Sequence, residues 1–114
     1  MKRDVPDRGD ILRLDLDPAP GKEQQGQCYV LVLTLSAFNR FGLALVAPIT
    51  QGDQFARGNG FAVSMMATGS KIQGVVLCNQ VRMLDFKQAS AKVVEGAQEI
   101  IIDDVLARVR ALVD

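Results

Sequence analysis

An almost unbroken apolar run, CYVLVLTL from Cys28 to Leu35, is the feature that most limits how this chain can fold. It is rich in β-formers and has no polar face. Short apolar runs of this kind are typical of strands that are buried on both faces. We therefore expect a strand over 28–36 with both of its faces buried.

A polar segment bounded by glycines, 21–26, precedes this run. It holds, in order, Lys22, Glu23, Gln24 and Gln25. Residues 11–17 before it alternate apolar and charged side chains from Leu12 onward, which predicts a half-buried strand. The polar segment is thus expected to be a loop between two strands. Loops held by a rigid scaffold often carry binding and catalytic groups.

Further short β-rich runs are separated by glycine-containing turns. We expect strands over 43–50, 60–66 and 75–86, a turn or short helix over 36–42 that is closed by Gly42, and a long mobile loop over 51–60. Because proline lacks an amide donor, Pro48 favours an edge or a bulge for the 43–50 strand.

In the C-terminal segment, apolar residues recur at intervals of three and four residues, which predicts an amphipathic helix. Its apolar stripe consists of Ile102, Val105, Leu106, Val109, Leu112 and Val113. Acidic residues lie near the start of the segment and arginines near its end, which suits the helix dipole. The stripe is either a core-packing face or a partner surface. About five antiparallel strands and one C-terminal helix indicate a mainly β, α+β domain, a small SH3-like antiparallel barrel with a C-terminal helix.

Length and composition limit the class of protein. The 114 residues, 48% of them hydrophobic, suffice for one domain over 1–114 with its own core. No apolar run approaches the roughly 20 residues of a membrane span, and the N-terminus lacks a signal-peptide pattern. We therefore expect a cytoplasmic protein with no membrane association.

Catalysis by histidine is excluded, because the chain contains no histidine. Cys28 and Cys78 both lie in apolar runs without CxxC spacing, so we expect buried reduced thiols rather than a disulfide or a metal pair. No metal or other cofactor is expected.

Charge is balanced overall but unevenly placed. Residues 18–92 hold seven basic side chains and three acidic ones, although the formal net charge of the chain is zero. This distribution fits either an ordinary solvated surface or a modest anion-facing patch.

Eight short segments, taken together, resemble the MazF/PemK toxin family, in its ChpB branch. They are RGDI at 8–11, LDP at 16–18, GKEQQG at 21–26, AFNR at 37–40, APITQG at 47–52, FAR at 55–57, GF at 60–61 and GVVLCNQVRMLD at 74–85. Each segment alone is a weak signal, but their order and coverage of nearly the whole chain make the resemblance specific.

The resemblance implies a toxin of a toxin–antitoxin pair that forms a homodimer of CcdB/PemK-type barrels. Such toxins cut single-stranded RNA at short sequences without a metal, and they leave a 2′,3′-cyclic phosphate and a 5′-hydroxyl. Their expected partners are single-stranded mRNA and a MazE- or ChpS-like antitoxin, whose extended tail blocks the RNA groove.

The resemblance also assigns candidate site residues. Thr50, Glu23 and Lys22 are the candidate catalytic residues, with Thr50 at the family's catalytic or phosphate-contacting threonine. The candidate RNA-binding residues are Gln24, Gln25, Gln51, Arg57, Phe61, Asn79, Gln80 and Arg82. Each also has an ordinary structural interpretation, as a solvated loop side chain, a turn former or a core residue.

The chain departs from the family pattern at several catalytic positions. Cys28 and Tyr29 stand where an Arg-Pro pair is usual, and Lys22 stands where some members have histidine. Leu77 and Asn79 replace an arginine and an aspartate of the PemK branch. A catalytically impaired module that binds the antitoxin or RNA therefore stays as the alternative, and a CcdB-like gyrase poison is a third one.

Overall fold

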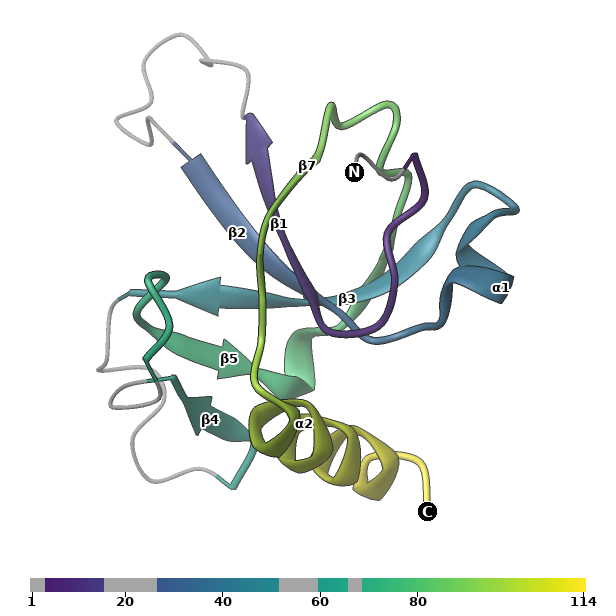
Figure 1. The fold of residues 1–114 in the computed structure, drawn as a ribbon. Coiled ribbons are helices and arrows are strands. Elements are labelled where there is room, and N and C mark those ends of the chain that lie inside the picture. Colours follow the sequence, from purple (N-terminus) through teal and green to yellow (C-terminus); the bar gives the residue numbers. More distant parts are fainter. Residues whose placement is uncertain (1–3, 16–26, 52–59, 66–68) are drawn as a thin grey trace, which may run out of the picture.

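A single antiparallel sheet and one long helix make up most of the computed structural model, which describes residues 4–15, 27–51, 60–65 and 69–114 (Figure 1). The elements are β1 (Asp10–Asp15), β2 (Gln27–Val32), α1 (Ser36–Asn39), β3 (Ala44–Thr50), β4 (Ala62–Ser64), β5 (Val75–Leu77), the 3₁₀ turn η1 (Cys78–Gln80), β6 (Arg82–Leu84), β7 (Lys92–Gly96) and α2 (Glu99–Ala111). The strand order is β4-β5-β3-β2-β1-β7, and β6 also pairs with β3. The expected mainly β antiparallel fold with a C-terminal helix is confirmed.

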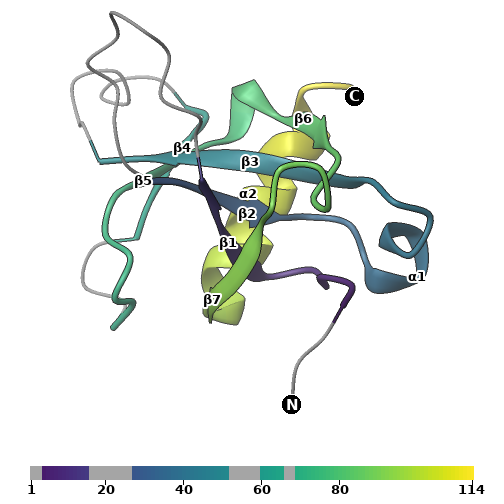
Figure 2. The same ribbon diagram turned by 90° about the horizontal axis from the view of Figure 1, so that it is seen from above.

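The first part of the apolar run that begins at Cys28 forms β2, which ends at Val32 rather than at the expected residue 36, and supplies both cores. Val30, Leu31 and Val32 have no exposed surface, as a strand buried on both faces requires. Leu31 belongs to the core between the sheet and α2, whereas Val30 and Val32 belong to a second core closed by Leu84 and Phe86. The view from above shows α2 crossing beneath β2 and β3 (Figure 2).

Pro48 does not mark a sheet edge, so the first of the two expected alternatives, an edge or a bulge, is wrong. β3 is central, with β2 on one side and with β5 and β6 on the other. On the second side, β6 pairs with β3 as far as Val46 and β5 pairs with β3 from Ile49 onward. Among the described residues, no recorded pair on this side covers the residues of β3 between these two positions. Pro48 lies in that gap, where a residue without an amide donor is tolerated.

The expected single strand over 75–86 is also wrong, because η1 divides it into β5 and β6. The polar pair Asn79–Gln80 is exposed on this turn, and the amide of Cys78 donates to the carbonyl of Phe61. The interruption lets the two short strands pair with different ends of β3.

β7 was not expected from the sequence. Its residues are mostly exposed, so they lack a strong apolar pattern, yet they pair with β1 through a bulge between Ile11 and Leu12. The Glu95 carboxylate on β7 accepts hydrogen bonds from the amides of Lys71 and Ile72, at 3.0 and 3.1 Å. β7 thereby ties the turn before β5 to the other end of the sheet.

The C-terminal helix forms as expected, with a modified apolar stripe. Ile101 and Val105 are buried against the sheet, and Leu106 and Val109 pack beside them. Most of the helix stripe is thus a core-packing face. The end of the predicted stripe is an exception, because Leu112 and Val113 are exposed.

A polar network joins α1 to the N-terminal segment. The Asn39 side chain is fully buried, and its amide group donates to the carbonyls of Pro6 and Thr34, at 2.8 and 2.9 Å. The Thr34 hydroxyl donates to the Asn39 amide oxygen at 2.6 Å and accepts from the amide of Leu45. These bonds fix the turn that leads from β2 into β3.

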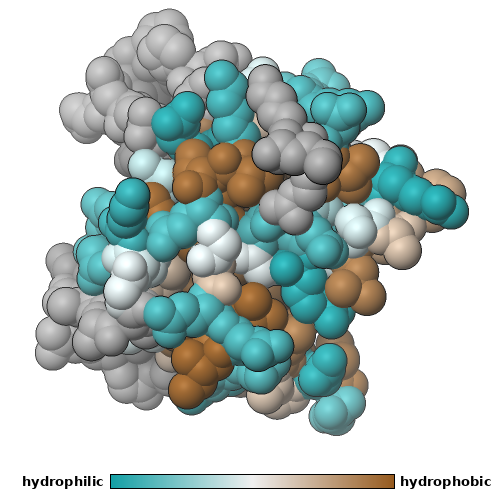
Figure 3. Space-filling model, in the orientation of Figure 1, coloured by the Kyte–Doolittle hydropathy of each residue, from teal (hydrophilic) through white to brown (hydrophobic). Residues whose placement is uncertain are grey.

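Several apolar side chains remain exposed on this single chain. They include Leu35, Phe38, Phe41 and Leu43 around α1, and Val93, Val94 and Ile100 on β7 and α2. Apolar surface appears as brown patches among teal polar residues in Figure 3. Among the described residues, no helix is both long enough and apolar enough to cross a membrane.

Candidate active site

A pocket of about 590 Å³ lies where the start of β2, the end of β3 and the β5–η1 junction meet. Its lining residues are Cys28, Tyr29, Pro48, Ile49, Thr50, Gln51, Leu77 and Gln80. The pocket therefore brings together residues from three sequence regions that are about 20 to 30 residues apart.

Strand register places the half-buried Thr50 in this pocket. Tyr29 pairs with Ile49 across β2 and β3, and Thr50 pairs with Val75 across β3 and β5. Gly74 precedes β5 with φ +142°, and a Cβ at this position would lie 2.5 Å from the Thr50 carbonyl oxygen. Only glycine lets the two backbones approach so closely, and this contact fixes the end of β3 that carries Thr50.

Three of the predicted site residues line the pocket together. Thr50 lies at the end of β3, the exposed Gln51 follows it, and the exposed Gln80 reaches the pocket from η1. The predicted site residues Lys22, Glu23, Gln24, Gln25 and Arg57 lie outside the described residues.

The other described candidates do not line the pocket. Phe61 is half-buried and packs against the core beneath α2. The Arg108 guanidinium, paired with Asp104 at 2.8 Å, donates to the carbonyl of Gly60 and so anchors the chain beside Phe61. Asn79 is exposed on η1, next to the pocket residue Gln80.

Arg82 is the remaining described candidate. It lies exposed on β6 and pairs with Val46 of β3. The register thus places its backbone four residues before Thr50 along β3, away from the pocket lining.

Sequence reasoning did not single out Tyr29, Pro48 or Ile49 as site residues. It noted Cys28, Tyr29 and Leu77 as replacements at family positions, without assigning them a role in the site, and all three line the pocket. A signal for these positions lies in strand pairing, because Tyr29 and Ile49 become neighbours through the β2–β3 register. That register is a tertiary property that a single sequence does not display.

The pocket chemistry suits recognition of phosphate and bases. The Thr50 hydroxyl and the carboxamides of Gln51 and Gln80 donate and accept hydrogen bonds without carrying charge. Cys28, Pro48 and Leu77 supply apolar surface against which an unstacked base can pack. Carboxylate, ammonium or guanidinium groups would have to enter from neighbouring segments, because none of the lining residues carries one.

Both cysteines are free thiols, as the sequence predicts, but the expected burial is wrong for Cys28. Cys78 is fully buried, while Cys28 is partly exposed at the pocket. Burial raises the pKa of Cys78 to about 11 from 9.0, with a smaller increase from Asp104 that is opposed by Arg108.

This pKa predicts a loss of stability at alkaline pH. Between pH 9.0 and about 11 the unfolded chain loses the Cys78 proton while the folded chain keeps it. The contribution is fully present below pH 9 and should fall by on the order of 2 kcal/mol as the pH rises to 11. Urea unfolding across pH 8–11 measures it. Cys78→Ala should flatten the decline, whereas Cys28→Ala should keep it; equal declines in both variants would contradict the assignment.

Comparison with protein families gives a match over residues 7–113 to the model of the "PemK-like, MazF-like toxin of type II toxin-antitoxin system". Among curated proteins, the chain is 44% identical to the endoribonuclease toxin ChpB of Escherichia coli K12, over 100% of this chain and 99% of that protein. It is also 44% identical to the endoribonuclease PemK of E. coli, over 93% of this chain and 80% of that protein.

Solved structures show the same fold. MazF in a MazE–MazF crystal structure from Deinococcus radiodurans is 32% identical, with a TM-score of 0.81 and coverage of 95% of both chains. A second crystal structure, of MazF from the same organism, is 32% identical with a TM-score of 0.77, over 95% of this chain and 96% of that chain.

Proposed function

Because the chain belongs to the PemK-like, MazF-like toxins of type II toxin–antitoxin systems, we propose that it is a metal-independent, sequence-specific endoribonuclease. Its substrate is single-stranded mRNA, and its products carry a 2′,3′-cyclic phosphate and a 5′-hydroxyl. Cutting mRNA stops translation and growth. The observation that carries this proposal is the pocket that joins the Thr50 hydroxyl to the carboxamides of Gln51 and Gln80.

The reaction uses the RNA's own 2′-hydroxyl as nucleophile. A base removes its proton, the oxygen attacks phosphorus, the bond to the 5′-oxygen breaks, and an acid protonates that leaving oxygen. Glu23 is our candidate base, and Lys22 is our candidate acid or phosphate contact. Thr50 donates a hydrogen bond to a phosphate oxygen, where negative charge grows in the transition state.

Sequence specificity arises from neutral polar and aromatic groups. Gln51 and Gln80 hydrogen-bond base edges in the pocket, and Asn79 extends this surface along η1. Our other candidate RNA contacts are Gln24, Gln25, Arg57, Phe61 and Arg82. The two arginines contact phosphate, and Phe61 borders the approach of a base.

Regulation follows the pattern of the relatives. The D. radiodurans crystal structure contains MazE together with MazF, and we propose a MazE- or ChpS-like antitoxin as the partner of this chain. We also propose a cytoplasmic homodimer, which would cover part of the exposed apolar surface on β7, α2 or α1.

The test is cleavage of a long, unstructured RNA by purified protein in EDTA, with the ends of the fragments mapped. Discrete cuts with 5′-hydroxyl ends are expected. Thr50→Val, which keeps the shape of the side chain and removes its hydroxyl, should lower kcat/KM by about 100-fold. Thr50→Ser retains the hydroxyl and should keep most of the activity. Cleavage by Thr50→Val at the wild-type rate would remove Thr50 from the mechanism.

A binding module without catalysis is the second candidate function. Cys28 and Leu77, which stand where relatives of the MazF and PemK branches are expected to carry arginines, line the pocket, and neither side chain is a guanidinium. Intact RNA after incubation with folded, dimeric protein would support this function and overturn the endoribonuclease proposal.

A further inference from the structure

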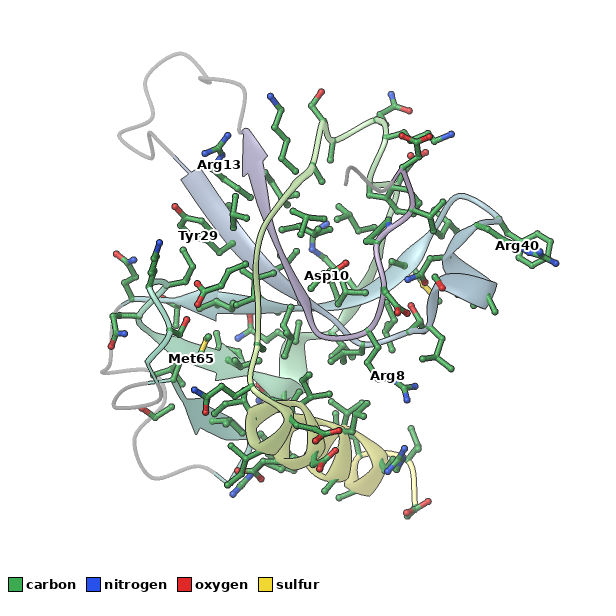
Figure 4. All side chains as sticks on the ribbon, viewed as in Figure 1. Arg8, Asp10, Arg13, Tyr29, Arg40 and Met65 are labelled. Atoms are coloured by element: carbon green, nitrogen blue, oxygen red, sulfur yellow. The ribbon has the colours of Figure 1, made fainter. Side chains whose placement is uncertain are left out.

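Three side chains form a row across one face of the sheet. None of them is one of the pocket residues that carry the proposed chemistry, Thr50, Gln51 and Gln80. Arg13 of β1 pairs with Tyr29 of β2 on one side and with Lys92 of β7 on the other. Residues directly opposite one another on neighbouring antiparallel strands point to the same face. The row therefore places a guanidinium between a phenol and an ammonium, and Figure 4 shows Arg13 beside Tyr29.

The Nε atom of the Arg13 guanidinium is buried, and no described residue forms a hydrogen bond with it. A buried donor without a partner is unfavourable, and such atoms in a folded protein call for an explanation, which a ligand can provide. Since guanidinium is always charged and is well suited to phosphate, an anion is the natural ligand.

Two neighbouring carboxylates, Asp10 on β1 and Glu95 on β7, accept hydrogen bonds from backbone amides. The two oxygens of Glu95 accept from the amides of Lys71 and Ile72, and Oδ2 of Asp10 accepts from the amide of Asp7. Like charges opposite one another destabilise a strand pair, so an anion between Arg13 and Lys92 would relieve their repulsion.

We infer that the Tyr29–Arg13–Lys92 row binds a backbone phosphate of single-stranded RNA next to the nucleotides held in the pocket; this inference rests on the proposed function. Tyr29 connects the two places, because it lines the pocket and is also the neighbour of Arg13. Lys92 lies exposed on the edge strand β7, where RNA can reach it. Arg13 and Lys92 thus supply affinity, whereas the pocket supplies sequence reading and cleavage.

The experiment measures binding of a fluorescent, mixed-sequence 2′-O-methyl RNA, which lacks the free 2′-hydroxyl needed for cleavage. Phosphate contacts do not depend on base sequence, so a mixed pool is a suitable probe. Arg13→Gln should weaken binding about fivefold at 0.1 M salt and reduce the slope of log affinity against log salt by about 0.7, as the loss of one phosphate contact requires. Lys92→Gln should produce a smaller change in the same direction. Lys87→Gln removes an exposed lysine outside the row and should change neither quantity.

Two further readouts separate the possible outcomes. Lys92 is exposed, so Lys92→Gln tests the row even if Arg13→Gln fails to fold. Unchanged affinity and unchanged salt slope in folded Arg13→Gln and Lys92→Gln proteins would overturn the inference. Binding of the same proteins to polyglutamate is measured as well. If they lose binding to polyglutamate but keep RNA binding, the row binds an acidic protein segment and the inference is overturned.

Cleavage of unmodified RNA by the wild-type protein is measured in parallel. If wild-type protein does not cut RNA but the salt slope depends on Arg13, the endoribonuclease proposal fails and the row stands. If wild-type protein cuts RNA and neither variant changes the slope, the row fails and the endoribonuclease proposal stands.

Discussion

Replacing Asn39 with alanine should lower the free energy of unfolding by about 2 to 4 kcal/mol. The side chain has no exposed surface and makes three hydrogen bonds, to the carbonyls of Pro6 and Thr34 and to the Thr34 hydroxyl. Alanine would leave these partners without Asn39 and create a small cavity. For a chain of this size, the midpoint of thermal unfolding should fall by about 10 °C or more.

Calorimetry and urea unfolding of the purified protein measure the effect. The matched control is Asn79→Ala, which removes an asparagine that is exposed on η1 and should leave stability within about 0.5 kcal/mol of wild type. Equal stability of the Asn39→Ala and Asn79→Ala proteins would show that the buried network does not hold α1 and the N-terminal segment together.

Replacing Gly74 with alanine should reduce both stability and RNA cleavage. The new Cβ would lie 2.5 Å from the Thr50 carbonyl oxygen and 3.2 Å from Cγ2 of Ile49, at a φ of +142° that disfavours any side chain. The atom nearest to the new Cβ belongs to the backbone of Thr50, so the end of β3 would have to move. We expect a loss of about 2 to 3 kcal/mol in stability and at least about tenfold in kcat/KM, because small displacements of a catalytic group strongly reduce the rate.

Gly69→Ala provides the control for backbone strain. Gly69 has φ +82°, but the nearest atom to a new Cβ is Nε2 of Gln98 at 3.5 Å. This variant should lose a little stability and keep its activity. If Gly74→Ala cleaves RNA like Gly69→Ala, the contact between Gly74 and Thr50 does not position the site.

The strongest sequence patterns predicted the fold best. The apolar run from Cys28 and the helical period near the C-terminus both correspond to observed elements. Each pattern extends over enough residues to specify which side chains are buried. β7 escaped prediction because its stability comes from pairing with β1, and its exposed residues carry no apolar alternation. Pro48 was misplaced for a related reason: the gap between β5 and β6 that tolerates it exists only in three dimensions.

Sequence motifs indicated only part of the candidate site. Thr50, Gln51 and Gln80 lie in recognisable segments and line one pocket. Tyr29 and Arg13 carry no motif signal, and strand register alone makes them neighbours. The spatial relation of Lys22 and Glu23 to Thr50 stays a prediction, since the first two lie outside the described residues.

Pairing of β1 with β7 also determines when a newly made chain can finish folding. β1 begins at Asp10, whereas β7 ends at Gly96 and is followed by α2, which packs on the core. Until β7 and α2 leave the ribosome, one edge of β1 has no partner and the core beneath α2 stays open. A chain interrupted before β7 cannot complete its sheet, so a cell that makes this toxin is exposed to the folded form only after β7 and α2 have been synthesised.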